Sequence, residues 1–138
     1  MTLSMRLELV PLAVSDPDAA KDWYVDRAGF EVNVDVTPRE GMRVVQLTPP
    51  GSSCSVVFGT GMPEISDQVP GSTKALHLVT DDIRAVRDDL RSRGVDVKEV
   101  EDMGGVLFAY FADPDGNSWL LQEFPKDQLQ PPAAGLAG

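Results

Sequence analysis

The stretch Phe111-Ala112-Asp113-Pro114-Asp115-Gly116-Asn117 is the most informative segment of the sequence for predicting the fold. Its proline and glycine are typical of a tight turn between two strands, and its aspartates are expected to bond the backbone of that turn rather than to catalyse a reaction. A second turn of this kind, Thr48-Pro49-Pro50-Gly51, occurs earlier in the chain. The two turns indicate that the chain consists of two similar halves.

Each half also contains one helix with matching ends. Asp16 and Asp82 follow short apolar runs and suit helix N-caps, because their carboxylates can accept the free N–H groups of the first turn. Gly29 and Gly94, separated by the same interval as the two turn glycines, suit the left-handed residue that ends a helix. The aromatic pair Trp23-Tyr24 is expected to anchor the first helix to a sheet.

Alternation of apolar and polar residues predicts the strands. Short apolar runs open the two halves, from Val10 to Asp16 and from Leu76 to Asp82. The strands that follow are expected at 30–36, 42–47 and 54–58 in the first half, and at 95–100, 106–111 and 119–124 in the second. This order predicts an α+β protein of two βαβββ modules, at about 5–59 and 74–124, within one domain over 1–124. A Pro/Gly-rich linker is expected over about 60–73, and a flexible tail over 125–138.

Charge and cysteine content exclude several classes of function. The chain has 12 Lys and Arg against 22 Asp and Glu, for a net charge of −10, so nucleic acid and membrane surfaces are poor partners. Its single cysteine, Cys54, rules out an intramolecular disulfide framework and is expected to be a buried thiol rather than a nucleophile. With no long apolar segment and no signal peptide in view, a cytoplasmic protein is expected.

The repeat and its motifs resemble the vicinal oxygen chelate superfamily, which includes glyoxalase I, extradiol dioxygenases and bleomycin-binding proteins. The residues that carry the resemblance are Val14-Ser15-Asp16 with Trp23-Tyr24 and Gly29-Phe30, Asp82-Ile83, Leu90 to Gly94, and the turn 111–117. The resemblance covers about 7–124. It implies a cup-shaped, eight-stranded sheet with helices on its outer face, and a homodimer.

The resemblance also implies where metal-using members of this superfamily hold their ion. The corresponding positions here are Leu9, Ser55, Ala75 and Leu120, where the family carries His, Glu or Gln. A divalent ion needs nitrogen or oxygen lone pairs, which Leu and Ala lack and a Ser hydroxyl supplies weakly. We therefore expect these four residues to form the dry floor of the cup, with neither a metal nor another cofactor.

The polar groups of the cup are expected one step away from that floor. His77 lies two residues after Ala75, and Gln122 two after Leu120, so period-two alternation puts each pair on one face. Gln46 and Tyr110 are further candidates, although their orientation stays open because the turns leave the strand parity uncertain. His77, the only histidine, is the candidate catalytic residue.

Two functions follow from this pattern. The first is metal-independent binding of a small, amphiphilic or cationic molecule in an apolar cup, similar to bleomycin resistance by sequestration. The second is a lyase, isomerase or dioxygenase-type enzyme that uses His77 as a general base or a metal held at displaced ligands. The sequence leaves the identity of the ligand open.

Overall fold

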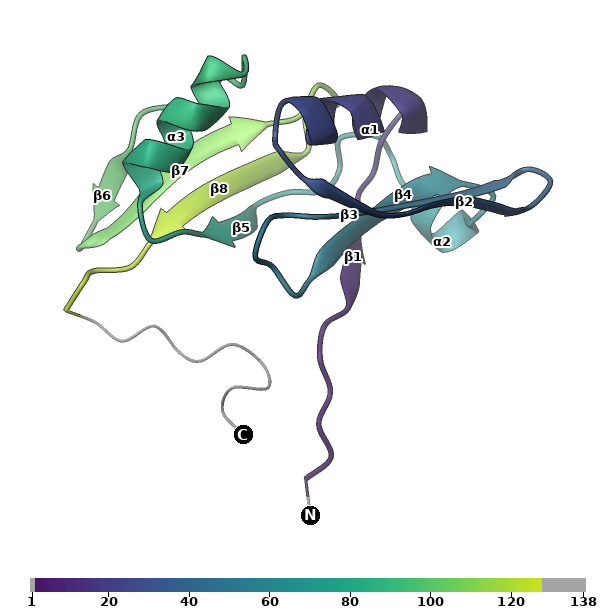
Figure 1. The fold of residues 1–138 in the computed structure, drawn as a ribbon, viewed down its shortest axis with the longest axis horizontal. Coiled ribbons are helices and arrows are strands. Elements are labelled where there is room, and N and C mark those ends of the chain that lie inside the picture. Colours follow the sequence, from purple (N-terminus) through teal and green to yellow (C-terminus); the bar gives the residue numbers. More distant parts are fainter. Residues whose placement is uncertain (1, 128–138) are drawn as a thin grey trace.

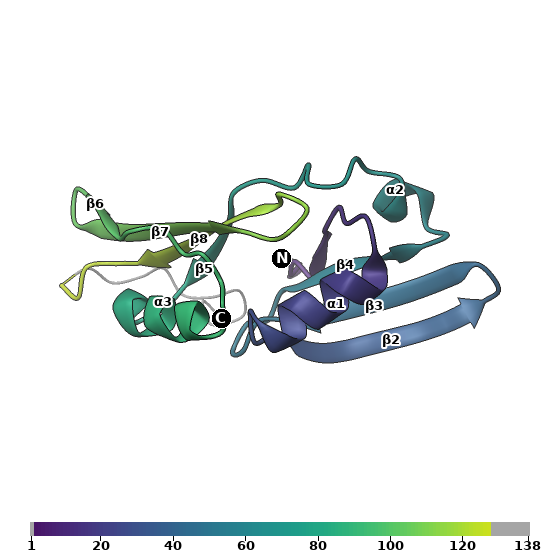
Figure 2. The same cartoon turned by 90° about the horizontal axis from the view of Figure 1, so that it is seen from above.

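The computed structural model describes residues 2–127, so most of the expected tail at 125–138, residues 128–138, lies outside the described part. The chain forms two βαβββ modules, each with its own four-stranded sheet (Figure 1). The α+β class is therefore confirmed, and the eight strands form two sheets rather than one continuous sheet. Seen from above, α1 and α3 lie over the sheets of different modules (Figure 2).

The first module follows the predicted order closely. Its elements are β1 (Leu9–Pro11), α1 (Pro17–Asp26), β2 (Glu31–Arg39), β3 (Met42–Thr48) and β4 (Ser55–Thr60). The sheet order is β1-β4-β3-β2, with β1 parallel to β4 and the other pairs antiparallel. A short helix, α2 (Pro63–Ser66), lies in the stretch expected to be an irregular linker.

The second module repeats this topology with one difference from the prediction. Its elements are β5 (Leu76–Val79), α3 (Ile83–Ser92), β6 (Glu101–Met103), β7 (Val106–Ala112) and β8 (Ser118–Glu123), in the order β5-β8-β7-β6.

The prediction of a strand at 95–100 was wrong. Val95 and Val97 are buried as the alternation predicted, but the ladder with β7 begins only at Glu101. Within residues 95–100, the backbone N–H of Lys98 donates a hydrogen bond to the Tyr110 carbonyl on β7.

Both helices begin where the sequence indicates. The Asp16 carboxylate accepts hydrogen bonds from the backbone N–H groups of Asp18 and Ala19, and Pro17 occupies the first helical position, where no N–H is needed. The Asp82 carboxylate likewise accepts from the N–H of Ala85. Among the described residues, no helix is long and apolar enough to cross a membrane.

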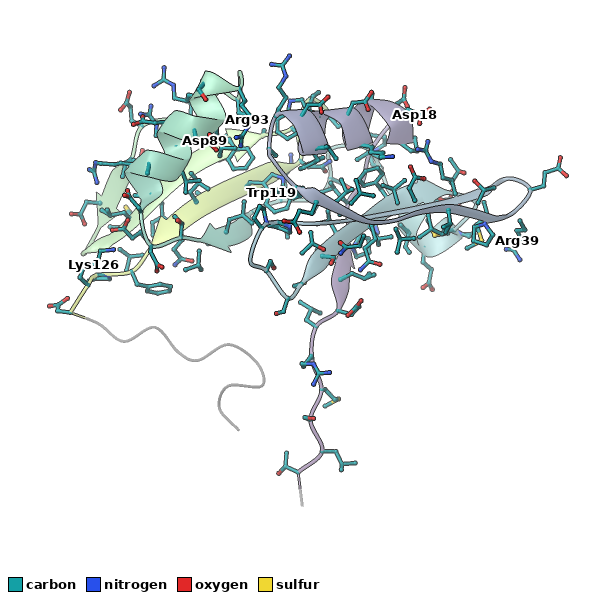
Figure 3. All side chains as sticks on the ribbon, viewed as in Figure 1. Asp18, Arg39, Asp89, Arg93, Trp119 and Lys126 are labelled. Carbon is teal, nitrogen blue, oxygen red and sulfur yellow. The ribbon has the colours of Figure 1, made fainter. Side chains whose placement is uncertain are left out.

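Helices α1 and α3 pack against one face of the first and the second sheet, respectively, and we call the opposite face of each sheet the open face. Alternate residues such as Val45 and Phe111 point to the helices and join one apolar core shared by both modules. Tyr24 is fully buried in this core, with its ring 5.2 Å from that of Phe30 and 5.9 Å from that of Trp119. Trp119 lies where the two modules meet (Figure 3).

A buried polar cluster joins α1 to the turn at 113–117. The Tyr24 hydroxyl donates to Asp113 Oδ2 at 2.7 Å and accepts from Trp119 Nε1 at 2.9 Å. Asp113 Oδ1 accepts the backbone N–H groups of Asp115 and Asn117, as expected for turn aspartates. Burial, and next the charge of Asp113, raises the pKa of Tyr24, so this hydroxyl stays protonated and donates.

The two helices end against each other in a reciprocal arrangement. Arg27 Nη1 donates to the backbone carbonyl of Arg93 at 3.1 Å, and Arg93 Nε donates to the carbonyl of Arg27 at 2.8 Å. These two arginines are the C-caps of α1 and α3, so each helix end receives a cation from the other module. Gly94 beside them has a φ of +90°, a left-handed conformation that favours glycine.

An ion-pair cluster holds α1 to the β2–β3 hairpin. Asp35 accepts from Lys21 Nζ at 2.6 Å and from both Nε and Nη2 of Arg43 at 3.1 Å. Arg43 also pairs with Asp18 at the start of the helix. Hydrogen bonds from Arg43, and next those from Lys21, lower the pKa of Asp35 to about 2.

Removing the Tyr24 hydroxyl is expected to destabilise the protein. Tyr24→Phe leaves the Trp119 indole N–H without its acceptor and takes one donor from Asp113, which costs about 1–3 kcal/mol of unfolding free energy. Urea denaturation followed by tryptophan fluorescence measures this loss. The control is Tyr110→Phe, which alters a side chain that is 43% exposed and should change stability by less than about 0.5 kcal/mol.

Asp35 is expected to give the stability a defined pH dependence. A lowered pKa in the folded state means that the ion pairs stabilise fully above the ordinary Asp pKa of about 4 and are lost as the pH falls towards 2. The difference in unfolding free energy between the wild type and Asp35→Asn should therefore be constant near neutral pH and shrink below about pH 4. Urea titrations at several pH values test this, and a difference unchanged at pH 2 contradicts it.

Candidate functional site

The open face of the first sheet carries two of the predicted floor residues side by side. Leu9 on β1 lies directly opposite Ser55 on β4. Ser55 is buried, and its hydroxyl lies 2.7 Å from that of Thr48 on β3. Leu9 and Ser55 are therefore neighbours on adjacent strands, as predicted for two floor residues.

The open face of the second sheet carries the only histidine. His77 on β5 lies opposite Leu120 on β8, and Leu120 lies opposite Tyr110 on β7. These three side chains form one row across three strands. The structure thus puts His77 in the same row as Leu120, where the sequence analysis placed it one step away.

Ala75 takes a different place from the one the repeat suggested. It precedes β5 and its backbone N–H donates to Ser118 Oγ at 2.7 Å, two residues before Leu120. The strand-to-helix connections differ in length, since β1 ends five residues before the cap Asp16 and β5 ends three before Asp82. One alignment offset therefore cannot superpose both the helices and the first strands of the two halves.

The strand register settles the orientation of the remaining candidates. Gln46 alternates with the core residues Val45 and Leu47, so it lies on the open face, where its side-chain amide donates to Glu8 at 3.4 Å. Tyr110 lies on the same face of its own sheet, opposite Leu120. Gln122 lies opposite Val79, one step beyond the His77 row.

A cleft between the two modules adjoins the His77 row. Its volume is about 600 Å³. The walls come from the end of α1, the turn between β3 and β4, the strand β5 and the helix α3, through residues 28–30, 49–53, 77–80, Val86, Asp89, Leu90, Arg93, Phe111 and Leu121. Because β5 is the edge strand of its sheet, the cleft runs along that edge. We call this the inter-module cleft.

Most of the cleft is apolar, and its polar groups are few. Phe30, Phe111 and Leu121 supply apolar wall, whereas Asp89 and Arg93 form an ion pair of 2.7 Å on α3. Both charged side chains lie at the end of α3 that faces α1 (Figure 3). His77 borders the cleft from the edge strand β5. Its Nδ1 lies 2.8 Å from the Ala75 carbonyl oxygen, and its ring packs edge-on against Phe108, which is not among the cleft residues.

The residues at the positions implied for a metal do not fit one. With the register that the structure shows, the set becomes Leu9, Ser55, Leu120 and either His77 or Ala75. One imidazole and one hydroxyl fall short of the three or four ligands that a catalytic or structural ion takes. Within residues 2–127, no three His, Cys, Asp or Glu side chains come together in a group that could hold an ion.

Cys54 does not join the cleft as a reactive group. It is half-buried, and burial, followed by the nearby Glu8 charge, raises the pKa of its thiol. The expected full burial of this thiol was therefore wrong, although its raised pKa lowers the fraction of nucleophilic thiolate.

Most of the cleft residues, including Phe30, Asp89 and Arg93, were not predicted from the sequence. Asp89 and Arg93 are spaced four apart on a helix, which reads as an ordinary surface ion pair. One sequence signal could have indicated Arg93: it directly precedes Gly94, the glycine that ends the second helix of the repeat.

Fold and cleft together define a tandem βαβββ protein with a space of small-molecule size between its modules. A family model described as Glyoxalase/Bleomycin resistance protein/Dioxygenase superfamily matches residues 6–121. The chain belongs to this superfamily.

Several known proteins are similar to the chain. The crystal structure of TnmS3, an antibiotic binding protein from Streptomyces sp. CB03234, is 36% identical, covers 89% of this chain and 98% of its own, and has a TM-score of 0.74. A superfamily member from Sphaerobacter thermophilus DSM 20745 is 32% identical over 86% of this chain and 97% of its own, with a TM-score of 0.72. The uncharacterized protein YetH of Bacillus subtilis (strain 168) is 26% identical over 120 residues, 86% of this chain and 98% of YetH.

Proposed function

We propose that the protein binds and sequesters a small molecule in the inter-module cleft, without a resident metal and without changing the molecule chemically. The observation that carries this proposal is the cleft itself, with a volume of about 600 Å³ and a largely apolar wall. Ligand sites are concave, mostly apolar spaces with a few polar groups, and their volumes start at about 300 Å³.

Burial of an apolar ligand surface supplies the affinity. Each Å² of apolar surface removed from water contributes about 25 cal/mol, and the partly accessible lining residues Leu78, Val79 and Val86 offer such surface. The similarity to an antibiotic binding protein at 36% identity supports the same class of function here.

The charge of the chain narrows the class of ligand and partner. A net charge of −10 attracts cationic or amphiphilic molecules and repels phosphate backbones and anionic lipid heads. We therefore propose a ligand with a cationic or neutral polar end, no nucleic-acid partner and a cytoplasmic location.

An enzymatic function is the second candidate, and one observation favours it. The contact of His77 Nδ1 with the Ala75 carbonyl leaves Nε2 free to accept a proton from a molecule in the cleft, as a general base does. Lyase or isomerase chemistry, or a dioxygenase reaction with a metal at other ligands, would convert the ligand during incubation. Sequestration returns it unchanged.

The apolar wall gives the proposal a direct test. Val79 lines the cleft and is 45% exposed, so Val79→Asp should fold normally and place a carboxylate in the binding space. We expect its affinity for the neutral fluorophore N-phenyl-1-naphthylamine, measured by fluorescence titration, to fall about tenfold, which corresponds to about 1.4 kcal/mol.

The matched control is Met103→Asp, which changes an exposed apolar residue on β6 that is not among the cleft residues and should leave the affinity unchanged. Repeating the titration after dialysis against EDTA tests metal independence. Equal losses in both variants, or loss of binding after EDTA, contradict the proposal.

We further propose that the protein is a homodimer. Each sheet leaves two edge strands and an open face with partly exposed apolar residues, such as Val36 and Tyr110. Edges and apolar faces of this kind favour association with a second copy. Sedimentation velocity at micromolar concentration should give the mass of two chains, and a monomer there rules the dimer out.

A further inference from the structure

We infer that Ala75 fixes His77 as a hydrogen-bond acceptor, so that the inter-module cleft selects its ligand through a hydroxyl or protonated amine that donates to His77 Nε2. This inference rests on the proposed function and names the class of ligand. A hydroxyl and a protonated amine share one property, which is that each supplies a hydrogen-bond donor on an otherwise apolar ligand.

The first step concerns the proton on the imidazole ring. His77 Nδ1 lies 2.8 Å from the Ala75 carbonyl oxygen, and a carbonyl oxygen can only accept. Nδ1 must therefore carry the hydrogen and donate it. In the neutral ring, Nε2 then has no hydrogen and offers a lone pair. This is the opposite of the tautomer that predominates in free histidine.

The second step concerns the backbone that presents this carbonyl. Ala75 has φ of +59°, and it is the only non-glycine residue with positive φ in the part of the chain that the structure describes. Such a conformation costs about 1 kcal/mol or more for a residue with a Cβ, and it persists only where neighbouring contacts enforce it. The hydrogen bond from the Ala75 N–H to Ser118 Oγ, at 2.7 Å, is one such contact.

Several other polar side chains of the cleft already use donors within the protein. Ser52 Oγ donates to the Cys54 carbonyl at 2.7 Å. Arg93 gives Nη1 to Asp89 and Nε to the Arg27 carbonyl, and the Asp89 carboxylate can only accept. Together with Nε2 of His77, these groups favour a ligand that brings its own donor.

The tautomer can be measured directly, because His77 is the only histidine of the chain. Untagged protein labelled with ¹⁵N-histidine gives one set of imidazole signals. At pH 8, where imidazole side chains are neutral, we expect long-range ¹H–¹⁵N correlations to show the hydrogen on Nδ1. A hydrogen on Nε2 overturns the inference, whatever the ligand.

Two substitutions test Ala75 as a positioning residue. Ala75→Gly tolerates positive φ and should keep the Nδ1 hydrogen, whereas the β-branched side chain in Ala75→Val disfavours it and should shift the hydrogen towards Nε2. A tautomer that is the same in all three proteins overturns the role of Ala75. If Ala75→Val does not fold, the wild-type spectrum and the next experiment still decide the matter.

Ligand selection is tested with three probes that share one ring system: 2-naphthol, 2-naphthylmethylamine and 2-methoxynaphthalene. The first two carry a neutral and a charged donor, and the third carries none. We expect at least one donor probe to bind about fivefold more tightly than the methoxy compound, and this preference to vanish in His77→Phe. The two donor probes distinguish a hydroxyl from an amine.

Failure of the inference can be told apart from failure of the proposed function. If all three probes bind equally, the cleft binds small molecules and the selection through His77 is wrong. If none of the probes binds, the proposed function and the ligand class both fail, and the histidine spectrum still decides the role of Ala75.

Discussion

The structure depends on the need to satisfy one buried carboxylate, that of Asp113. An unpaired charge in this position would cost several kcal/mol, so all the bonds around it form together. Tyr24 reaches it from the first helix, and Asn117 donates both to it and to the Ala13 carbonyl at 2.7 Å. The Asn117 side chain also accepts the backbone N–H of Thr73. One polar cluster thereby fixes the turn at 113–117, the first helix and the connection between modules, and with them both walls of the cleft.

The parts of the fold that could be predicted from the sequence are those set by local chemistry. Asp16 and Asp82 cap helices, and the turn at 113–117 closes on its own aspartate, because these bonds lie within a few residues of one another. The strand at 95–100 was mispredicted for the opposite reason. Val95 and Val97 are buried, but their segment does not pair with a neighbouring strand. Burial alone does not distinguish a strand from an unpaired extended segment.

The site was less predictable because it depends on register and on contacts between modules. Aligning the two halves with one constant offset predicted that Ala75 pairs with Leu120. In the structure, the β5–β8 pairing puts His77 opposite Leu120 instead. Alternation put Gln46 and Tyr110 on one face or the other without deciding which, and the strand pairing decided it. The cleft joins segments more than 80 residues apart, such as Phe30 and Phe111, and no local pattern brings such residues together.

The exchange of hydrogen bonds between Arg27 and Arg93 has a consequence for folding. Each arginine side chain donates to the backbone carbonyl at the helix C-terminus of the other module. The C-terminal end of each helix therefore depends on a hydrogen bond from the other module. The aromatic core is shared in the same way, through the contacts of Tyr24 and Phe30 with Trp119. Despite the repeat, the two halves should therefore lose structure in a single cooperative transition instead of melting one after the other.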